Sequence, residues 1–446
     1  MHFKKLGKLV KETGSNAGKI LTSKTTLKDI YSVSLYRNAI FLMINSAAMA
    51  LTGFFFWIVA ARLYPVESVG LASAAIGAAG FLTLFSTLGL DQAIIRFLPA
   101  AGNKARNMIN SVFSLVGGVS LLLSVIFIAG LNLWSPALLP IRQNPVFILV
   151  FVLFTVGSLL QSIAGQAFIA KRKSGFALIQ GQIFAILRFV PLFLLAPYFK
   201  TYGIFASLAI LMFFSITIST LIFIPRVEKG YVPRPVIKKE IIKEMVGYSV
   251  ANYVTSILWM LPQTVLPLIV ANVLGTEQNA YYYIGWSVAS ILFSIPAAVS
   301  FSLFAEGAHR EENLGIEIIR ALKLLALILI PAIIILSIFN AKILSFFGHN
   351  YSINGIKLFW FLTFSAIPLS INYIFYAIKR VERKMKPLIL MAAFVAVVTI
   401  GLSYLLLPRM GIEGAGLAWL SGQSAGAVFV VYSLLKRQSL PLKNGD

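Results

Sequence analysis

The chain has 446 residues, of which 59% are hydrophobic and only 12% are charged, and its mean hydropathy is +0.87. Thirty-eight Lys and Arg against 15 Asp and Glu give a formal net charge of +23, and no Cys is present. This composition leaves too little polar sequence to cover a soluble globule, and the lack of Cys excludes disulfides, thiolate metal sites and a cysteine nucleophile.

Sequence patterns argue against three further functions: metal binding, nucleotide-driven pumping and nucleic-acid binding. The three histidines, His2, His309 and His349, do not stand at metal-ligand spacing, and no GxxxxGK[ST] phosphate loop occurs. The cations alternate with apolar stretches, which is typical of a membrane protein and not of a nucleic-acid-binding one. We therefore expect no cofactor, no metal and no nucleic-acid partner.

The chain begins with a basic segment, residues 1–36, that has no continuous apolar core. We interpret it as a cytoplasmic segment and not as a cleaved signal peptide. Beyond it, stretches long enough to cross the roughly 30 Å hydrocarbon core of a bilayer follow one another, joined by short turns. Twelve stretches qualify: 38–61, 69–90, 108–133, 146–170, 175–197, 203–225, 247–273, 280–304, 319–340, 356–378, 387–407 and 412–435.

The distribution of Lys and Arg predicts the orientation. With both termini on one side, that side receives 31 of the 38 cations. The opposite side receives six, namely Arg62, Arg142, Lys200, Lys342, Lys357 and Arg409. Cytoplasmic loops of membrane proteins are enriched in Lys and Arg. We expect a multi-pass protein of the cell membrane with both termini in the cytoplasm.

The two halves of the chain match when it is shifted against itself by about 210 residues. Lys171-Arg172-Lys173 aligns with Glu382-Arg383-Lys384 at an offset of 211, and Tyr202-Gly203-Ile204 with Met410-Gly411-Ile412 at 208. Six spans per half keep both halves in the same orientation, as in a parallel repeat. The predicted organisation is a six-helix lobe at 37–225, a basic cytoplasmic linker at 226–245, a second six-helix lobe at 246–436 and a tail at 437–446. A parallel pseudo-two-fold axis relates the lobes around a central cavity.

The run from Phe54 to Ala100 and the run from Gly411 to Leu420 resemble a known family. The relevant features are the pair Arg62-Leu63 closing the first span, the small-residue span from Gly70 to Gly89, the motif GLDQAIIR from Gly89 to Arg96, and GIEGAGLAWL. They are similar to signatures of the polysaccharide-export flippases. These belong to the multidrug, oligosaccharidyl-lipid and polysaccharide flippase superfamily.

The resemblance implies an all-helical transporter that is not an enzyme. It implies that a polyprenyl-(di)phosphate-linked oligosaccharide moves from the cytoplasmic to the outer leaflet, for assembly of a surface polysaccharide or glycan. A glycan polymerase or glycosyltransferase is then an expected partner. Two alternatives stay open: a cation-coupled multidrug or metabolite exporter of the same superfamily, and a membrane glycosyltransferase or polymerase. The latter needs a poised carboxylate or His in a sizeable outer loop, whereas the outer loops here are short.

Arg188 is the cation that the topology does not explain, because it lies well inside the fifth span. A guanidinium at such depth is expensive unless it faces a wet cavity or an anion, and its planar fork suits a diphosphate or an acidic sugar. We predict that it binds substrate together with Arg96. Asn45 and Gln161 are amides within spans that could bind sugar hydroxyls. The aromatic cluster from Tyr281 to Trp286 is interpreted as an interfacial belt.

Asp91 and Glu306 are predicted to act in gating or ion coupling. Asp91 and Arg96 lie at the cytoplasmic end of the second span, and the offset of 210 places Glu306 opposite Arg96 in the second lobe. We expect Arg96 and Glu306 to approach across the cytoplasmic mouth. The two acids are also the candidates for taking up a proton or a sodium ion, so coupling to either gradient stays open.

Overall fold

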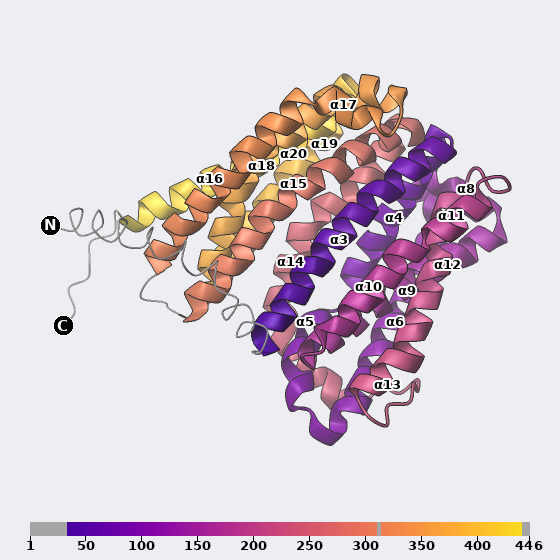
Figure 1. Ribbon diagram of the computed structural model, residues 1–446, viewed down its shortest axis with the longest axis vertical. Coiled ribbons are helices and arrows are strands. Elements are labelled where there is room, and N and C mark those ends of the chain that lie inside the picture. The colour runs from indigo at the N-terminus through magenta and orange to yellow at the C-terminus, as the bar shows by residue number, and fades with distance from the viewer. Residues whose placement is uncertain (1–33, 310–313, 439–446) are drawn as a thin grey trace, which may run out of the picture.

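The computed structural model describes the backbone of residues 34–309 and 314–438. Within these ranges the side chains of residues 34–47, 248, 249, 251, 305, 308, 309 and 434–438 are not described. All regular structure in the described chain is helical. Figure 1 shows two groups of long helices side by side, the first coloured indigo to pink and the second salmon to yellow. The all-helical fold with two lobes is the one predicted.

The described part of the N-terminal lobe contains eleven α-helices and a π-helical turn, with short 3-10 turns between some of them. Its long helices are α3 (Ser34–Leu63), α4 (Val66–Ser86), α6 (Ala105–Ala129), α9 (Pro145–Ala170), α10 (Ser174–Leu187) and α12 (Gly203–Ile218). Shorter ones continue or connect them: α5 (Leu90–Phe97), α7 (Leu131–Trp134), α8 (Leu139–Gln143), α11 (Phe189–Leu195), the π-helix η4 (Ser219–Phe223) and α13 (Ile224–Val227). The start of α9 shows how local sequence fixes a boundary. Asn144 caps it by accepting the Val146 N–H at 2.9 Å, and Pro145 takes the first position, where no donor is needed.

The C-terminal lobe consists of six long helices and one short one. They are α14 (Lys239–Leu274), α15 (Thr276–His309), α16 (Leu314–Ile338), α17 (Asn340–Ser345), α18 (His349–Val381), α19 (Met385–Met410) and α20 (Ile412–Gln438). Gly275, at φ +90°, makes the turn between α14 and α15 in a backbone conformation that other residues seldom adopt. α14 begins at Lys239, inside the predicted linker. The chain before it, from Glu228 to Lys238, runs back along α6.

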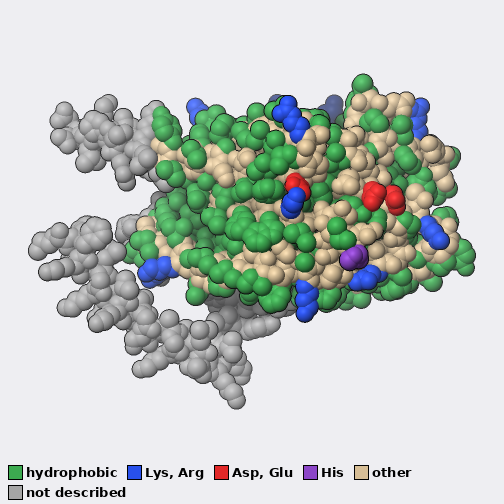
Figure 2. Space-filling view, turned by 90° about the horizontal axis from the view of Figure 1, so that it is seen from above, with side chains coloured by type: hydrophobic (Ala, Val, Ile, Leu, Met, Phe, Trp, Pro, Cys, Tyr) green, Lys and Arg blue, Asp and Glu red, His purple; other side chains and the backbone are tan. Residues whose placement is uncertain are grey.

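The predicted spans agree with the helices. Eleven segments of the described chain are long and apolar enough to cross a membrane, and they correspond to the second to twelfth predicted stretches. α3 has 30 residues, but its side chains are described only from Ala48, and Ala48–Leu63 is shorter than a full span. The first span therefore stays a prediction. Figure 2 shows the molecule from above the view of Figure 1, with hydrophobic side chains interspersed among other side chains and backbone and with few charged side chains.

The linker is fixed to the N-terminal lobe by hydrogen bonds to its backbone. Asn110 on α6 donates to the Val232 carbonyl at 2.9 Å, and the Lys238 N–H donates to Ser111 Oγ at 2.9 Å. Lys171 pairs with Glu228 at 2.7 Å. We call the end of the bundle with residues 97–105, 171–173, 228–238 and 382–384 the linker end. The opposite one, with residues 62–65, 130–145, 274–276 and 339–349, is the Arg62 end.

The backbone supports the duplication at the turns that close α9 and α18. Arg172 and Arg383, 211 residues apart, both adopt the left-handed conformation, with φ of 55° and 57°. The following residues make the same hydrogen bond: Lys173 N–H donates to Phe168 O at 2.8 Å and Lys384 N–H to Lys379 O at 2.9 Å. These are the bonds of one helix-ending motif used twice. The two lobes thus repeat a detail that helical composition alone does not require.

The two lobes pack together mainly through α4, which contacts both α14 and α15. Small residues line this face of α4, and a Cβ added at Gly70 would lie 1.6 Å from the Thr276 carbonyl oxygen. Backbones can approach so closely only where side chains are absent. The largest buried apolar cluster includes residues of both lobes, such as Phe56 and Trp419, whereas the clusters nearer the linker end belong to one lobe almost entirely. The lobes therefore share a core toward the Arg62 end.

Candidate functional site

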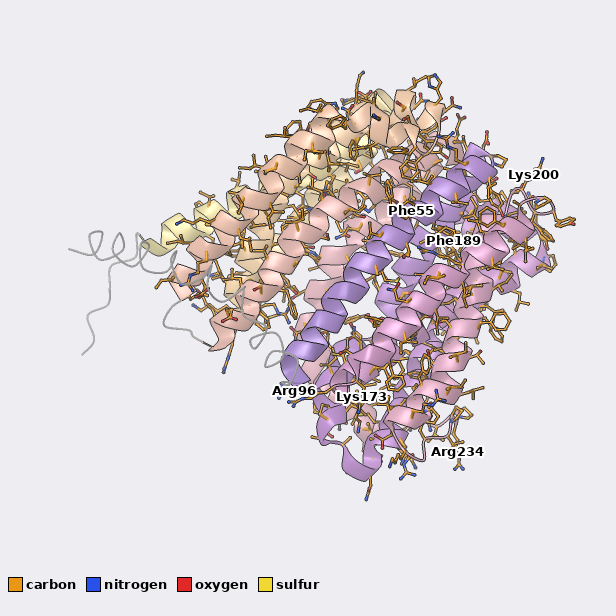
Figure 3. The ribbon with its side chains drawn as sticks, in the orientation of Figure 1. Phe55, Arg96, Lys173, Phe189, Lys200 and Arg234 are labelled. Carbon is orange, nitrogen blue, oxygen red and sulfur yellow. The ribbon has the colours of Figure 1, made fainter. Side chains whose placement is uncertain are left out.

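Arg188 lies at a break in the fifth span. α10 ends at Leu187 and α11 begins at Phe189, so Arg188 is the residue between them. Pro191 explains the break, because it has no N–H to donate to the Leu187 carbonyl and its ring crowds that carbonyl. Figure 3 labels Phe189 at the start of α11, close to α3 with Phe55, and it shows Arg96, Lys173 and Arg234 at the linker end and Lys200 at the opposite one.

The Arg188 side chain is buried, with 8% of its surface exposed. Its guanidinium lies over the Phe56 ring of α3, 4.5 Å from the ring centroid, and 5.8 Å from that of Phe184. Nη2 is 3.8 Å from the place where a Cβ on Gly53 would lie. The Tyr283 phenol of α15 is near enough to interact electrostatically with the cation. Arg188 is thus surrounded by α3 of its own lobe and α15 of the other.

One edge of this guanidinium is unused. Nε and Nη2 have no hydrogen-bond partner among the residues that the structure describes. These two nitrogens form the fork that grips two oxygens of one carboxylate or phosphate. A buried charged donor without a partner is costly, and in a membrane span more so. The arrangement is chemically suited to bind an anion with two oxygens.

The predicted amides are placed differently. Gln161 lies on α9, where its backbone carbonyl accepts a 3.4 Å hydrogen bond from Gln180 Nε2 on α10. Its own Oε1 is buried and has no hydrogen-bond partner in the described chain. Gln180 precedes Arg188 by two helical turns, about 12 Å along the axis, so Gln161 is nearer the linker end. Asn45 is on α3, in the part of that helix (residues 34–47) whose side chains the structure does not describe.

Asp91 lies on α5, directly after a second break. α4 ends at Ser86 and α5 begins at Leu90, and both Leu88 and Gly89 adopt positive φ angles of 51° and 73°. Tyr253 of α14 donates a 2.9 Å hydrogen bond to the Phe85 carbonyl at this break, and its phenol is near the Asp91 carboxylate. The acid predicted for gating is therefore beside a contact between the two lobes.

Arg96 and Glu306 are both exposed, at the end of α5 and near the end of α15. The ion pairs between described residues do not include this pair. Arg96 is 5.9 Å from the Phe97 ring centroid. The approach of Arg96 and Glu306 across the cytoplasmic mouth and their role as a gate remain predictions. Within 34–309 and 314–438, no three His, Asp or Glu side chains form a metal-binding group.

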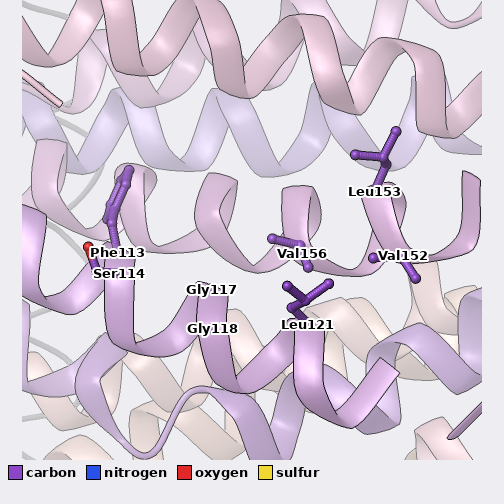
Figure 4. Close-up of a pocket in the computed structure, with 8 residues that line it drawn as sticks. All are labelled: Phe113, Ser114, Gly117, Gly118, Leu121, Val152, Leu153 and Val156. Carbon is purple, nitrogen blue, oxygen red and sulfur yellow. The ribbon is translucent and has the colours of Figure 1, made fainter. Parts of the chain in front are cut away.

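The cavity in Figure 4 is separate from these residues. It has a volume of about 350 Å³ and lies between α6 and α9. Its lining is apolar except for Ser114: Phe113, Ser114, Gly117, Gly118, Leu121, Val152, Leu153 and Val156. Because Leu121 and Leu153 are well exposed, this groove opens on the lipid-facing surface and contains none of the predicted site residues.

The environment of Arg188 includes residues that the sequence did not single out. Gly53 and Phe56 carry no signal in an apolar span, and Tyr283 was assigned to an interfacial belt. That interpretation is wrong for its neighbours: Tyr281 is 2% exposed and Tyr282 is fully buried. They pack against Tyr351 and Trp286, inside the protein. Aromatic composition alone does not distinguish an interior cluster from a belt.

Known proteins similar to this chain are transporters. No curated protein matches it. A structure of the lipid II flippase MurJ in an inward closed conformation has a TM-score of 0.72 at 16% identity, covering 91% of this chain and 88% of that one. An inward-facing multidrug resistance MATE family transporter of the MOP superfamily has a TM-score of 0.63 at 15% identity, covering 92% and 100%. A MOP superfamily transporter from Pyrococcus furiosus has a TM-score of 0.59 at 14% identity, covering 91% and 96%.

At such low identities these structural matches establish the fold alone. The family is established by a separate match. Residues 59–352 match the family described as polysaccharide biosynthesis protein. That range includes most of the N-terminal lobe, Arg188 and the start of α18. The chain belongs to the polysaccharide biosynthesis protein family, and its fold is that of the lipid II flippase MurJ and of the MATE transporters of the MOP superfamily.

Proposed function

We propose that this protein moves a polyprenyl-(di)phosphate-linked oligosaccharide from the cytoplasmic to the outer leaflet of the cell membrane by alternating access. The linker end would face the cytoplasm, as the excess of Lys and Arg there predicts. The substrate would pass between the lobes, and its phosphate groups would bind the free edge of Arg188. One observation is central to this assignment: Nε and Nη2 of a buried arginine at a helix break have no partner among the residues that the structure describes.

The sign of the charge supports an anionic substrate. A buried cation repels cationic drugs, and the ion pairs between described residues include none that joins Arg188 to an acid. The lobes share a core toward the Arg62 end, whereas toward the linker end each lobe packs on its own. This packing supports a state in which the outer side is closed and the lobes can move apart at the linker end. An anionic headgroup would then enter from the cytoplasm and reach Arg188.

Export is tested by replacing Arg188. We expect Arg188→Ala to abolish surface display of the glycan, and Arg188→Lys to keep a small part of it, since Lys retains the charge but not the fork. Arg142→Ala is the matched control, an exposed arginine on α8. The measurement is surface glycan against membrane level of the protein. Normal display by Arg188→Ala would overturn the proposal.

Binding is tested separately with purified protein. We expect an isoprenyl diphosphate to raise the unfolding temperature, and the matching isoprenyl alcohol to do so much less. The difference should vanish in Arg188→Ala and remain in Arg142→Ala. If the diphosphate and the alcohol stabilise the wild-type protein equally, the phosphate has no dedicated site.

Orientation is accessible to thiol labelling because the chain has no native Cys. Lys200→Cys and Arg234→Cys place single thiols at opposite ends, as Figure 3 shows. A membrane-impermeant maleimide added to intact cells should label the first and not the second. The reverse pattern would contradict the proposed direction of transport.

A further inference from the structure

Arg62, at the end of α3, bonds to the opposite lobe. Its Nε donates to the Phe346 carbonyl at 2.9 Å and its Nη2 to the Ser345 carbonyl at 2.8 Å. These carbonyls lie where α17 ends, and the last carbonyls of a helix lack partners within it. A cation there also interacts favourably with the helix dipole. The first helix of one lobe therefore caps a short helix of the other.

Asn272, near the end of α14, makes the converse contact. Its Nδ2 donates to the Trp134 carbonyl at 3.2 Å, where α7 ends. Its Oδ1 accepts from the Ala137 N–H at 3.1 Å and from Ser135 Oγ at 3.3 Å. Here the first helix of the C-terminal lobe binds the short helical connection of the N-terminal lobe.

The two contacts are copies related by the internal repeat. Arg62 and Asn272 are 210 residues apart, and so are the loop residues Ser135 and Ser345. Each lobe thus uses the equivalent position to hold the equivalent loop of its counterpart. The residue types differ: Arg62 only donates, whereas Asn272 donates and accepts. Both halves make this contact although their side chains differ, which indicates that the contact, and not one residue type, is what the two halves share.

A buried hydrogen bond lies between the same two lobes. Asn279 Nδ2 on α15 donates to the Gly70 carbonyl at 2.9 Å and to Ser73 Oγ at 3.0 Å, both on α4. Ser73 itself is fully buried. A reagent in solution can reach this position only if α4 and α15 separate. Ser73 is therefore a natural reporter of the closed outer side.

We propose that Arg62 and Asn272 are a matched pair of latches that hold the Arg62 end closed, and that this end opens only when both contacts break. The proposal rests on the alternating access inferred above. Each latch joins a side chain of one lobe to backbone of the other, so the lobes cannot separate at this end without breaking both contacts. Loss of both should shift the population toward the open state more than loss of one, since the two contacts do not share atoms.

The test uses Ser73→Cys as the only thiol in the chain, in detergent-purified protein without substrate. The measurement is the rate of maleimide modification, which follows the population of the open state. We expect Arg62→Ala and Asn272→Ala each to raise this rate by about tenfold or less, as loss of one or two hydrogen bonds predicts. The double variant should raise it by about the product of the two. Arg62→Lys should lie between wild type and Arg62→Ala.

Arg142→Ala, at the same end but outside the contact, is the control and should leave the rate unchanged. A rate unaffected by either latch variant, or raised by only one of them, would overturn the matched pair. An equal rise in the control would attribute the effect to general loosening and would overturn it as well. Because no substrate is present, any of these contrary results would leave the transport function to be decided independently by the Arg188 experiments.

Discussion

Two arginines of this protein occupy opposite situations. Arg62, at the seam between the lobes, is exposed and gives its donors to two backbone carbonyls. Arg188, inside the fifth span, is buried and leaves Nε and Nη2 without partners in the described chain. The Arg62 contact is completed by the protein's own atoms, whereas the fork of Arg188 has no partner in the described chain. A complete contact stabilises a conformation, and an incomplete one is suited to a ligand.

The largest effect is expected where the seam is tightest. Gly70→Ala should lower the free energy of unfolding by about 3 kcal/mol, because the added Cβ meets the Thr276 carbonyl oxygen and two helix backbones must move apart. The control is Gly118→Ala on α6, where a Cβ meets nothing within 4 Å. Unfolding of the purified protein in detergent measures both. Equal effects would mean that the seam tolerates a side chain.

Arg188→Met should act in the opposite direction on stability. Replacing a buried, unpartnered cation with an apolar side chain of similar length is expected to raise the free energy of unfolding by about 2 kcal/mol. Glycan export should nevertheless be lost. Such a gain in stability with loss of function distinguishes a binding residue from a structural one. A clear loss of stability would assign Arg188 to packing instead.

Asn279→Ala should destabilise by about 1 to 2 kcal/mol. The change removes the donor to the Gly70 carbonyl and to Ser73 Oγ, and it leaves buried polar atoms without a partner. Asn107→Ala, which removes an exposed amide on α6, is the matched control and should cost far less. Equal unfolding midpoints for the two variants would contradict a buried role for Asn279.

The smallest effect is expected at the second break. Tyr253→Phe removes only the hydroxyl that bonds the Phe85 carbonyl in the last turn of α4, just before the break. We expect a loss of about 0.5 to 1 kcal/mol, the net value of one hydrogen bond. Tyr404→Phe on α19, whose side chain is exposed, should change nothing. A larger loss at Tyr253 would mean that the break depends on this contact for its shape.

Sequence alone predicted the two lobes, eleven of the spans and the position of Arg188 inside one of them, because each of these depends on apolar runs and on a charge within one. The role of Arg188 in binding stays a prediction. It did not predict the seam. Arg62 and Asn272 stand at span ends, where polar residues are ordinary, and their partners are backbone atoms 284 and 138 residues away in the sequence. Pro191 marked the break beside Arg188, but Leu88 gave no sign of its left-handed conformation. Backbone geometry of this kind depends on tertiary contacts.

The turns at Arg172 and Arg383 bear on the ancestry of the chain. Glycine adopts the left-handed conformation without strain, and yet both copies of the repeat place an arginine there. Most of the residues around the two turns differ. At these turns the two halves therefore share the path of the backbone more closely than they share residue types. These turns are the natural points at which to align the halves of distant relatives, or to join a half from one protein to a half from another.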